Sequence, residues 1–204
     1  MRHFKFLTLV VITILGFNSC SDDDESTSLL TVESEQVSNL FAPQTLDVTV
    51  TPPVASGDFV KFDFSTGRTT TSDTDWDIAL RGTTILVNGG DSSGIAEEPI
   101  RTGNAAAYIV DDTFANVIAV TESSFIQDST DGLALPTGSG NGWYNYNPAI
   151  NAIQPIAGKV IVFRTADDRY AKIEILSYYK DAPSEITTDI AANDARYYTF
   201  NYVL

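Results

Sequence analysis

Apolar and polar residues alternate along most of the chain after residue 45, and this period of two is typical of β-strands. In "DFVKFDF" (58–64), Val60, Phe62 and Phe64 would lie on one strand face, with Lys61 and Asp63 on the other. Alternation or a short apolar run predicts further strands in "LDVTVT" (46–51), "TDWDIALRG" (74–82), "TTILVNGG" (83–90), "NAAAYIV" (104–110), "KVIVFRT" (159–165), "YAKIEILSYY" (170–179) and "RYYTFNYVL" (196–204).

The pattern also predicts which side chains enter the core. In "TDWDIALRG" it places Trp76, Ile78 and Leu80 inward and Asp77 and Arg81 in solvent. The two strands that flank the acidic turn "ADD" predict a hairpin. The last strand would carry its aromatic residues on one face: Tyr198, Phe200 and Tyr202.

No long helical period occurs, and glycine and proline interrupt the chain at regular intervals. The segment "DDTFANVIAVTESSF" (111–125) fits a short helical turn or an irregular link equally well. The sequence therefore predicts an all-β, mostly antiparallel fold: a twisted sheet or sandwich-like single domain with little helix.

The first twenty residues, "MRHFKFLTLVVITILGFNSC", have the features of an export signal. A basic start precedes an apolar stretch that is too short to span a bilayer, and small residues precede Cys20, the only cysteine. We expect residues 1–19 to be removed and Cys20 to carry acyl chains that hold the protein on a membrane. The alternative is ordinary cleavage with a free thiol, which is unfavourable in an exported protein.

An acidic, Ser/Thr-rich stretch begins with "SDDDES" directly after Cys20. Its composition predicts an acidic, flexible tether over residues 20–44, followed by one domain over residues 45–204. An acidic cluster in this position resembles the surface-export signal of Bacteroidetes lipoproteins. That resemblance implies a lipid anchor in the outer membrane and display on the cell surface.

The net charge of the chain is −15, and removal of Arg2 and Lys5 with the signal lowers it to about −17. Such a charge argues against binding to nucleic acid or adhesion to anionic lipid.

The residues that the chain lacks exclude several chemistries. The only histidine is His3 and the only methionine is Met1, so both leave with the predicted signal. Ser–His–Asp and Cys–His catalysis are excluded, as are zinc sites built from histidine or thiolate. No carboxylate pair stands out from the acidic background, and we expect no enzymatic activity. Asp73, Asp75 and Asp77 would share one face of an extended chain and could hold calcium, although any solvated strand has this spacing.

Three blocks occur in the order found in the HmuY family, and an aromatic final strand follows them: "DTDWDIALRGTTILVNGG" (73–90), "GWYNYNP" (142–148) and "PIAGKVIVFRTADDRYAKIEILSYYK" (155–180). The resemblance covers roughly residues 45–204. It implies a mostly β, haem-binding lipoprotein that captures haem for iron acquisition and passes it to a membrane transporter, for which a TonB-dependent outer-membrane receptor is the candidate.

The family's axial ligands cannot be transferred to this chain. Family members hold haem iron between two histidines or two methionines, one of them in the loop after the Gly-Trp pair. Here that loop is the region from Tyr146 to Asn151, which contains neither residue type.

The stretch "GSGNGWYNYNPAIN" (138–151) either grips a flat ligand or fills the core from a strand edge. Its candidate ligand contacts are Trp143, Tyr144 and Tyr146. Tyr144 or Tyr146 could ligate ferric iron as tyrosinate, or the rings could enclose a porphyrin or a sugar-like molecule without an iron bond. Because Tyr144 and Tyr146 are two residues apart on a strand, we expect both to be exposed or both to be packed.

Haem propionates would need basic partners on this acidic chain. The candidates for that role are Arg81, Arg101, Lys159 and Arg164.

The alternative function is a non-haem interaction or glycan-binding surface module on the same scaffold.

Overall fold

The computed structural model describes residues 33–204. The predicted signal, Cys20 and the first part of the predicted tether lie outside the described residues. None of the helices within residues 33–204 is long or apolar enough to cross a membrane.

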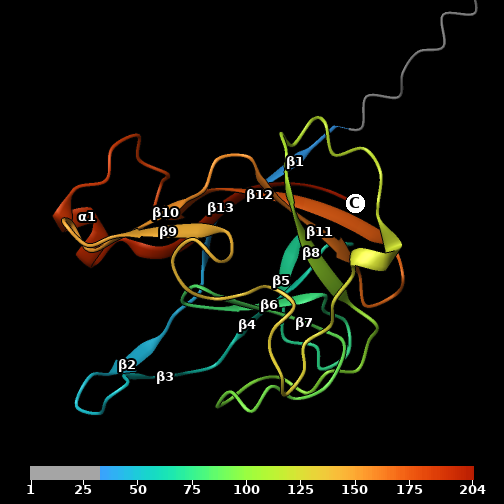
Figure 1. Cartoon of the computed structure of the whole chain (residues 1–204), viewed down its shortest axis with the longest axis horizontal. Coiled ribbons are helices and arrows are strands. Elements are labelled where there is room, and N and C mark those ends of the chain that lie inside the picture. Colours follow the sequence, from blue (N-terminus) through green and yellow to red (C-terminus); the bar gives the residue numbers. More distant parts are fainter. Residues whose placement is uncertain (1–32) are drawn as a thin grey trace, which may run out of the picture. The chain divides into compact units, whose positions relative to one another are not determined.

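The fold is mostly antiparallel β-structure with little helix, which confirms the prediction from the sequence (Figure 1). A five-stranded antiparallel sheet has the order β1-β13-β12-β11-β8 and contains β1 (Glu35–Phe41), β8 (Ala106–Asp111), β11 (Lys159–Arg164), β12 (Tyr170–Tyr179) and β13 (Ala195–Val203). A four-stranded antiparallel sheet has the order β5-β4-β6-β7 and contains β4 (Val60–Asp63), β5 (Arg68–Thr70), β6 (Ile78–Arg81) and β7 (Thr84–Val87).

Two short hairpins and two short helical segments complete the domain. The elements are β2 (Thr45–Asp47) with β3 (Val54–Ser56), β9 (Tyr144–Asn147) with β10 (Ala152–Pro155), the 3₁₀ turn Glu122–Ser124 and α1 (Thr188–Asn193). Thr187 caps α1 by accepting a hydrogen bond from the backbone N–H of Ile190. The segment 111–125, for which the sequence left a short helical turn or an irregular link open, is irregular after β8 and contains one 3₁₀ turn.

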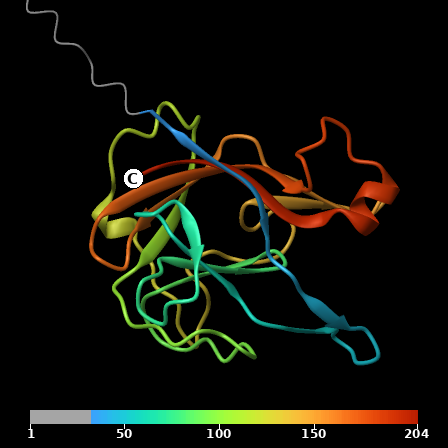
Figure 2. The same cartoon turned by 180° about the vertical axis from the view of Figure 1, so that it is seen from behind.

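The two larger sheets face one another and enclose the main core, as in a sandwich (Figures 1 and 2). Phe62 of β4 contacts Phe200 of β13, and Phe64, just after β4, contacts Phe163 of β11, with ring centroids 5.5 and 5.3 Å apart. The predicted inward faces of "DFVKFDF" and of the last strand are therefore confirmed.

β6 differs from the prediction because both of its faces are buried. Ile78 and Leu80 enter the main core, whereas Trp76 packs with Phe59, Ala79 and Leu86 in a second cluster on the other side of the small sheet. Residues of the loops 91–103 and 127–134 cover that side.

The prediction that Asp77 and Arg81 lie in solvent is consequently wrong. Asp77 is 5% exposed and accepts hydrogen bonds of 2.8 Å from the N–H groups of Phe64 and Ala166. Burial raises the pKa of Asp77, and these two bonds oppose the increase.

The predicted tether also ends earlier than expected. Residues 35–41, assigned to a flexible stretch over 20–44, form β1 and pair with β13 at the edge of the large sheet. Leu40 and Ala42 are buried in the core, and the Phe41 ring stacks on Tyr197 at 4.6 Å. The exposed, polar side chains of β1 hide this role from a composition argument, because an edge strand needs few apolar residues.

The strand predicted over 46–51 is short. β2 ends at Asp47, and Leu46, Val48 and Val50 are exposed instead of packed. Figures 1 and 2 both show the β2–β3 hairpin extending away from the two sheets.

Candidate functional site

Trp143 and Tyr144 are core residues. Trp143 is 3% exposed, its indole N–H donates to the carbonyl of Thr83 at 3.2 Å, and its ring lies 4.9 Å from that of Tyr144. Tyr144 is 7% exposed, and its hydroxyl accepts a 3.1 Å hydrogen bond from the backbone N–H of Gly138. The glycine-rich run therefore folds over Tyr144 and closes it off from solvent.

Tyr146 behaves differently, so the expectation that it shares the environment of Tyr144 is wrong. Its side chain is 43% exposed, and its hydroxyl donates to the side-chain oxygen of Asn151 at 2.6 Å. Tyr146 pairs with Ile153 in the β9–β10 hairpin, and this hairpin lies beside α1 (Figure 1). Of the two tyrosines among the three predicted ligand contacts, only Tyr146 is thus accessible.

The predicted basic partners do not gather around these rings. Arg81 is 3% exposed, lies 4.3 Å from the Phe59 ring centroid and pairs with Glu97 at 3.1 Å. Burial lowers the pKa of Arg81, although Glu97 partly offsets this effect. Lys159 pairs with Asp111, its cross-strand neighbour on β8.

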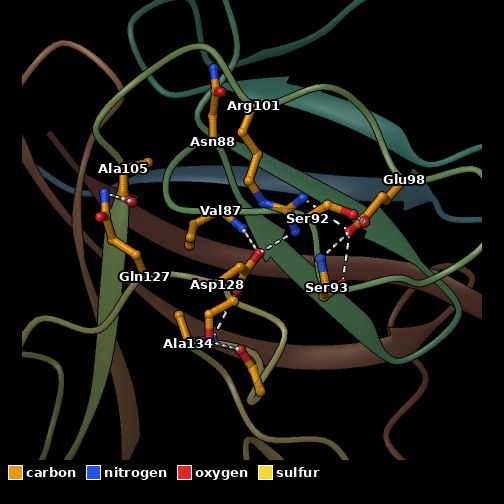
Figure 3. Close-up of polar contacts among 12 residues, drawn as sticks. Val87, Asn88, Ser92, Ser93, Glu98, Arg101, Ala105, Gln127, Asp128 and Ala134 are labelled. Carbon is orange, nitrogen blue, oxygen red and sulfur yellow. Dashed lines mark hydrogen bonds and ion pairs between the residues drawn. The ribbon is translucent and has the colours of Figure 1, made fainter.

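Arg101 belongs to a buried polar cluster that fixes the loops over the small sheet (Figure 3). Its guanidinium contacts Glu98 at 2.9 Å and Asp128 at 2.8 Å, and its side chain is 4% exposed. Asp128 also accepts bonds from the N–H groups of Val87 and Ala134 at 3.0 and 2.8 Å. Burial alone would raise the pKa of Glu98, but hydrogen bonds from Ser92, Ser93 and Arg101 lower it to about 2. The charged groups of this cluster pair with one another, so its role is structural. We call it the clamp.

Arg164 leads to a different surface. Cross-strand register places Arg164 beside Tyr170, and places Tyr108, Val162 and Lys172 in the next row of the same sheet face. This face points away from the core formed by the alternate residues of β11. Phe114 and Phe125, from the irregular segment 112–126, lie over it. We call the set Tyr108, Phe114, Phe125, Arg164, Tyr170 and Lys172 the outer aromatic face.

The rings and cations of the outer aromatic face are in contact. The Phe125 centroid lies 5.0 Å from that of Tyr108 and 6.0 Å from that of Tyr170, the latter pair nearly parallel at 16°. The guanidinium carbon of Arg164 is 5.5 Å from the Phe125 centroid, and the Lys172 ammonium is 4.4 Å from that of Phe114. Tyr170 is 42% exposed and is the solvent-accessible ring of this face.

The two cations of this face are only weakly neutralised. Lys172 donates to the carbonyls of Phe114 and Val117 at 2.6 and 2.8 Å and, within residues 33–204, makes no ion pair. Burial lowers the pKa of Lys172. Arg164 donates mainly to Asn104, with Asp168 at 3.9 Å.

Tyr170 contributes the accessible phenol of this face. Its hydroxyl donates to Glu122, and this hydrogen bond raises the pKa of Tyr170. The phenol is therefore protonated at neutral pH.

Sequence reasoning identified Arg164 but missed the rings and the lysine around it. The alternation of "YAKIEILSYY" already puts Tyr170 and Lys172 on the face opposite Ile173, which was the available signal. Phe114 and Phe125 carry no such signal, because they lie in a segment without period.

The three aspartates that could have held calcium, Asp73, Asp75 and Asp77, do not converge. Asp73 pairs with Lys61 at 3.1 Å, Asp75 binds the hydroxyls of Ser72 and Thr74, and Asp77 is buried. The residues between 71 and 77 do not form the extended strand that would align the three carboxylates. Across residues 33–204, no three acidic, cysteine or histidine side chains are grouped closely enough to hold a metal ion.

A separate groove of about 730 Å³ lies at the edge of the small sheet. Threonine hydroxyls dominate its polar lining, together with Lys61 and the carboxylates of Asp58, Asp73 and Glu97. With three acidic groups and one basic group, the groove is unsuited to an anionic ligand.

The model of the HmuY protein family matches residues 55–202, and the chain belongs to this family. Comparison with curated proteins gives no match.

Three solved structures are similar at low identity. A candidate lipoprotein of Bacteroides fragilis is 17% identical, with 85% of this chain and 90% of that chain covered and a TM-score of 0.47. A candidate HmuY-like haem-binding protein of Bacteroides vulgatus is 15% identical, with coverages of 84% and 92% and a TM-score of 0.43. The apo HmuY analogue of Tannerella forsythia is 14% identical, with coverages of 83% and 94% and a TM-score of 0.45. These are remote relatives, and the family assignment rests on the match over residues 55–202.

Proposed function

We propose that this chain is a non-enzymatic lipoprotein of the outer-membrane surface that captures haem, or a related flat anionic ligand, for iron acquisition. The outer aromatic face is the observation that carries the proposal. It combines four aromatic rings with Arg164 and Lys172 on a chain of net charge −15. Membership of the HmuY family supports the same ligand class.

The spacing of the two cations suits a ligand with two carboxylates on one edge. Lys172 is the diagonal cross-strand neighbour of Arg164, and residues in such positions lie about 7–8 Å apart, with their Cβ atoms somewhat closer. Aromatic rings beside them offer the apolar contact that a flat macrocycle needs. The hydrogen bonds that both cations make go to the amide side chain of Asn104 and to backbone carbonyls, and a ligand carboxylate is a stronger acceptor.

Iron ligation must differ from that of relatives with histidine or methionine ligands, because no residue after His3 is of either type. A tyrosinate can ligate ferric haem iron. Tyr170 lies on the outer aromatic face and Tyr146 on the β9–β10 hairpin, and they are 42% and 43% exposed. Since its hydrogen bond to Glu122 raises the pKa of Tyr170, ligation through Tyr170 should strengthen as pH rises.

Titration with ferric haemin tests the proposal, using residues 33–204. We expect a saturable, shifted Soret band. Arg164→Gln should weaken binding about tenfold, the typical effect of losing a charge-assisted hydrogen bond. Arg169→Gln is the matched control, because Arg169 is exposed and, among residues 33–204, forms an ion pair only with nearby Asp167. Absorbance identical to free haemin would overturn the proposal.

The two exposed phenols form a second matched pair for the same titration. Tyr170→Phe should change the position of the bound Soret band, while Tyr146→Phe should leave it unchanged. The reverse result would move the ligand to the β9–β10 hairpin and contradict the assignment to the outer aromatic face.

Attachment through acylated Cys20 and delivery to a TonB-dependent receptor are further parts of the proposal. Mass spectrometry of the natural protein should find acyl chains on the N-terminal Cys20, and Cys20→Ser should release the protein from membranes. An unprocessed leader would contradict this assignment.

The runner-up is a glycan-binding module, and the 730 Å³ groove favours it. Its threonine hydroxyls and carboxylates can exchange hydrogen bonds with a neutral sugar, whereas its acidic balance repels haem. Saturable binding of neutral oligosaccharides, lost in Thr70→Val, together with no haemin binding would favour this module.

A further inference from the structure

The irregular segment 112–126, which we call the strap, covers the outer aromatic face. Val160 and Val162 of that face are 0% and 2% exposed, although neither belongs to the main core or to the second cluster. Val162 lies beside Tyr108 and Lys172 in the sheet, and Val160 is two residues away on the same face. An apolar floor therefore lies beneath the strap, next to the rings and cations of the proposed ligand site.

The strap is weakly held in the fold. Its two ends are fixed by backbone hydrogen bonds, from Asp112 to Gly158 and between Ile126 and Ala107. Within residues 33–204, the backbone-to-backbone hydrogen bonds of the residues between these ends all stay inside the strap. None of the strap residues is buried. Segments with few buried groups and local backbone bonding are those that open without unfolding of the whole domain.

Three side chains of the outer aromatic face hold the strap down between its ends: Tyr108, Tyr170 and Lys172. The Tyr108 hydroxyl accepts a 2.8 Å hydrogen bond from the backbone N–H of Thr121. Tyr170 and Lys172 make the bonds to the strap that are described above. All three side chains belong to the proposed ligand site, so the strap and a ligand compete for them.

We propose that the strap is a gate that a haem-like ligand displaces. The closed strap covers the valine floor and occupies Lys172, and the ligand binds when the strap lifts. This inference rests on the proposed function. A ligand that binds only the open form has an apparent affinity reduced by the fraction of molecules that are open. Weakening one of the bonds that hold the strap should therefore tighten ligand binding, by the factor by which the open fraction grows.

Thiol labelling of residues 33–204 measures strap opening without any ligand. Cys20 lies outside this fragment, so an introduced cysteine is the only thiol. Val162→Cys places the thiol beneath the strap. Val87→Cys is the matched control, because Val87 is a valine of the main core at 0% exposure. With each rate divided by that of the urea-unfolded chain, Val162→Cys should react about tenfold faster or more. Equal rates would overturn the gate, whether or not haemin binds.

Tyr108→Phe removes one bond to the strap and keeps the ring. Loss of this hydrogen bond should raise the labelling rate of Val162→Cys about fivefold, and in the protein without an introduced cysteine it should tighten haemin binding by the same factor. A side chain that only contacted the ligand or supported the fold would not tighten binding when truncated. Tyr197→Phe is the control, because Tyr197 is a half-buried tyrosine of β13 that stacks on Phe41, and it should change neither value.

The haemin titration separates failure of the gate from failure of the proposed function. Wild-type protein that binds haemin, with Tyr108→Phe binding no more tightly, would overturn the gate and leave the proposed function intact. Wild-type protein that does not bind haemin would overturn both, even if the thiol of Val162→Cys is labelled rapidly.

Discussion

At the scale of single residues, the structure depends on buried charges, of which the sequence pattern places Arg81 in solvent. Arg81, Arg101 and Asp128 all lie inside, where each finds partners from distant segments. Alternation predicts the face on which a side chain lies but not whether a loop covers that face. Arg101 and Asp128 are 27 residues apart, and no local signal joins them.

Replacement of Asp128 should cost much of the stability of the domain. Asp128→Asn leaves Arg101 without one of its two carboxylate partners in a buried site, and such losses cost about 3 kcal/mol or more. Asp131→Asn, an exposed position three residues away, should change stability by less than about 0.5 kcal/mol. Urea unfolding of both variants measures the difference, and equal midpoints would contradict the role of the clamp.

Glu98 should contribute to acid sensitivity. Its folded pKa of about 2 lies below the ordinary value of 4.5, so its stabilising effect is complete above pH 4.5 and is lost as pH falls toward 2. Glu98→Gln should therefore lower stability at neutral pH and flatten the decline between pH 4.5 and 2. Thermal unfolding across this range checks the prediction, and parallel curves for variant and wild type would refute it.

At the scale of elements, the strands with clear alternation could be predicted from sequence, and the exceptions have physical causes. The β11–β12 hairpin and the aromatic face of β13 follow from period two, because one face of each meets the core. β1 could not be predicted, because an edge strand with mostly exposed polar side chains resembles a tether. The segment "LDVTVT" has the pattern of a strand, yet it lies in the projecting β2–β3 hairpin, where its apolar side chains are exposed instead of packed in the core.

The same Leu→Ala substitution in β1 and in β2 should distinguish a strand that packs in the core from one that projects beyond it. Leu40 is 6% exposed and Leu46 is 46% exposed. Leu40→Ala should destabilise the monomer by about 2–4 kcal/mol through lost burial and a cavity, while Leu46→Ala should cost less than about 0.5 kcal/mol. Chemical denaturation of both variants measures the two losses. Equal losses would mean that β1 is not an integral strand.

At the scale of the whole molecule, the family and the sandwich-like fold could be predicted from the sequence, but only part of the candidate site could. Membership of the HmuY family over residues 55–202 agrees with the motifs in "TDWDIALRG" and in the C-terminal hairpin. Of the predicted contacts, Trp143 and Tyr144 support the core, and Tyr146 and Arg164 remain accessible on separate elements. The outer aromatic face depends on cross-strand register and on the path of an irregular segment, neither of which a linear pattern contains.

The most direct test of the central claim is an NMR titration of residues 33–204 with ferric haemin, whose paramagnetic iron broadens signals close to it. We predict selective loss of signals from Tyr108, Phe125 and Tyr170, while those of the β9–β10 hairpin around Tyr146 persist. Broadening that centres on Tyr146, or that is spread evenly over the protein, would contradict haem capture at the outer aromatic face.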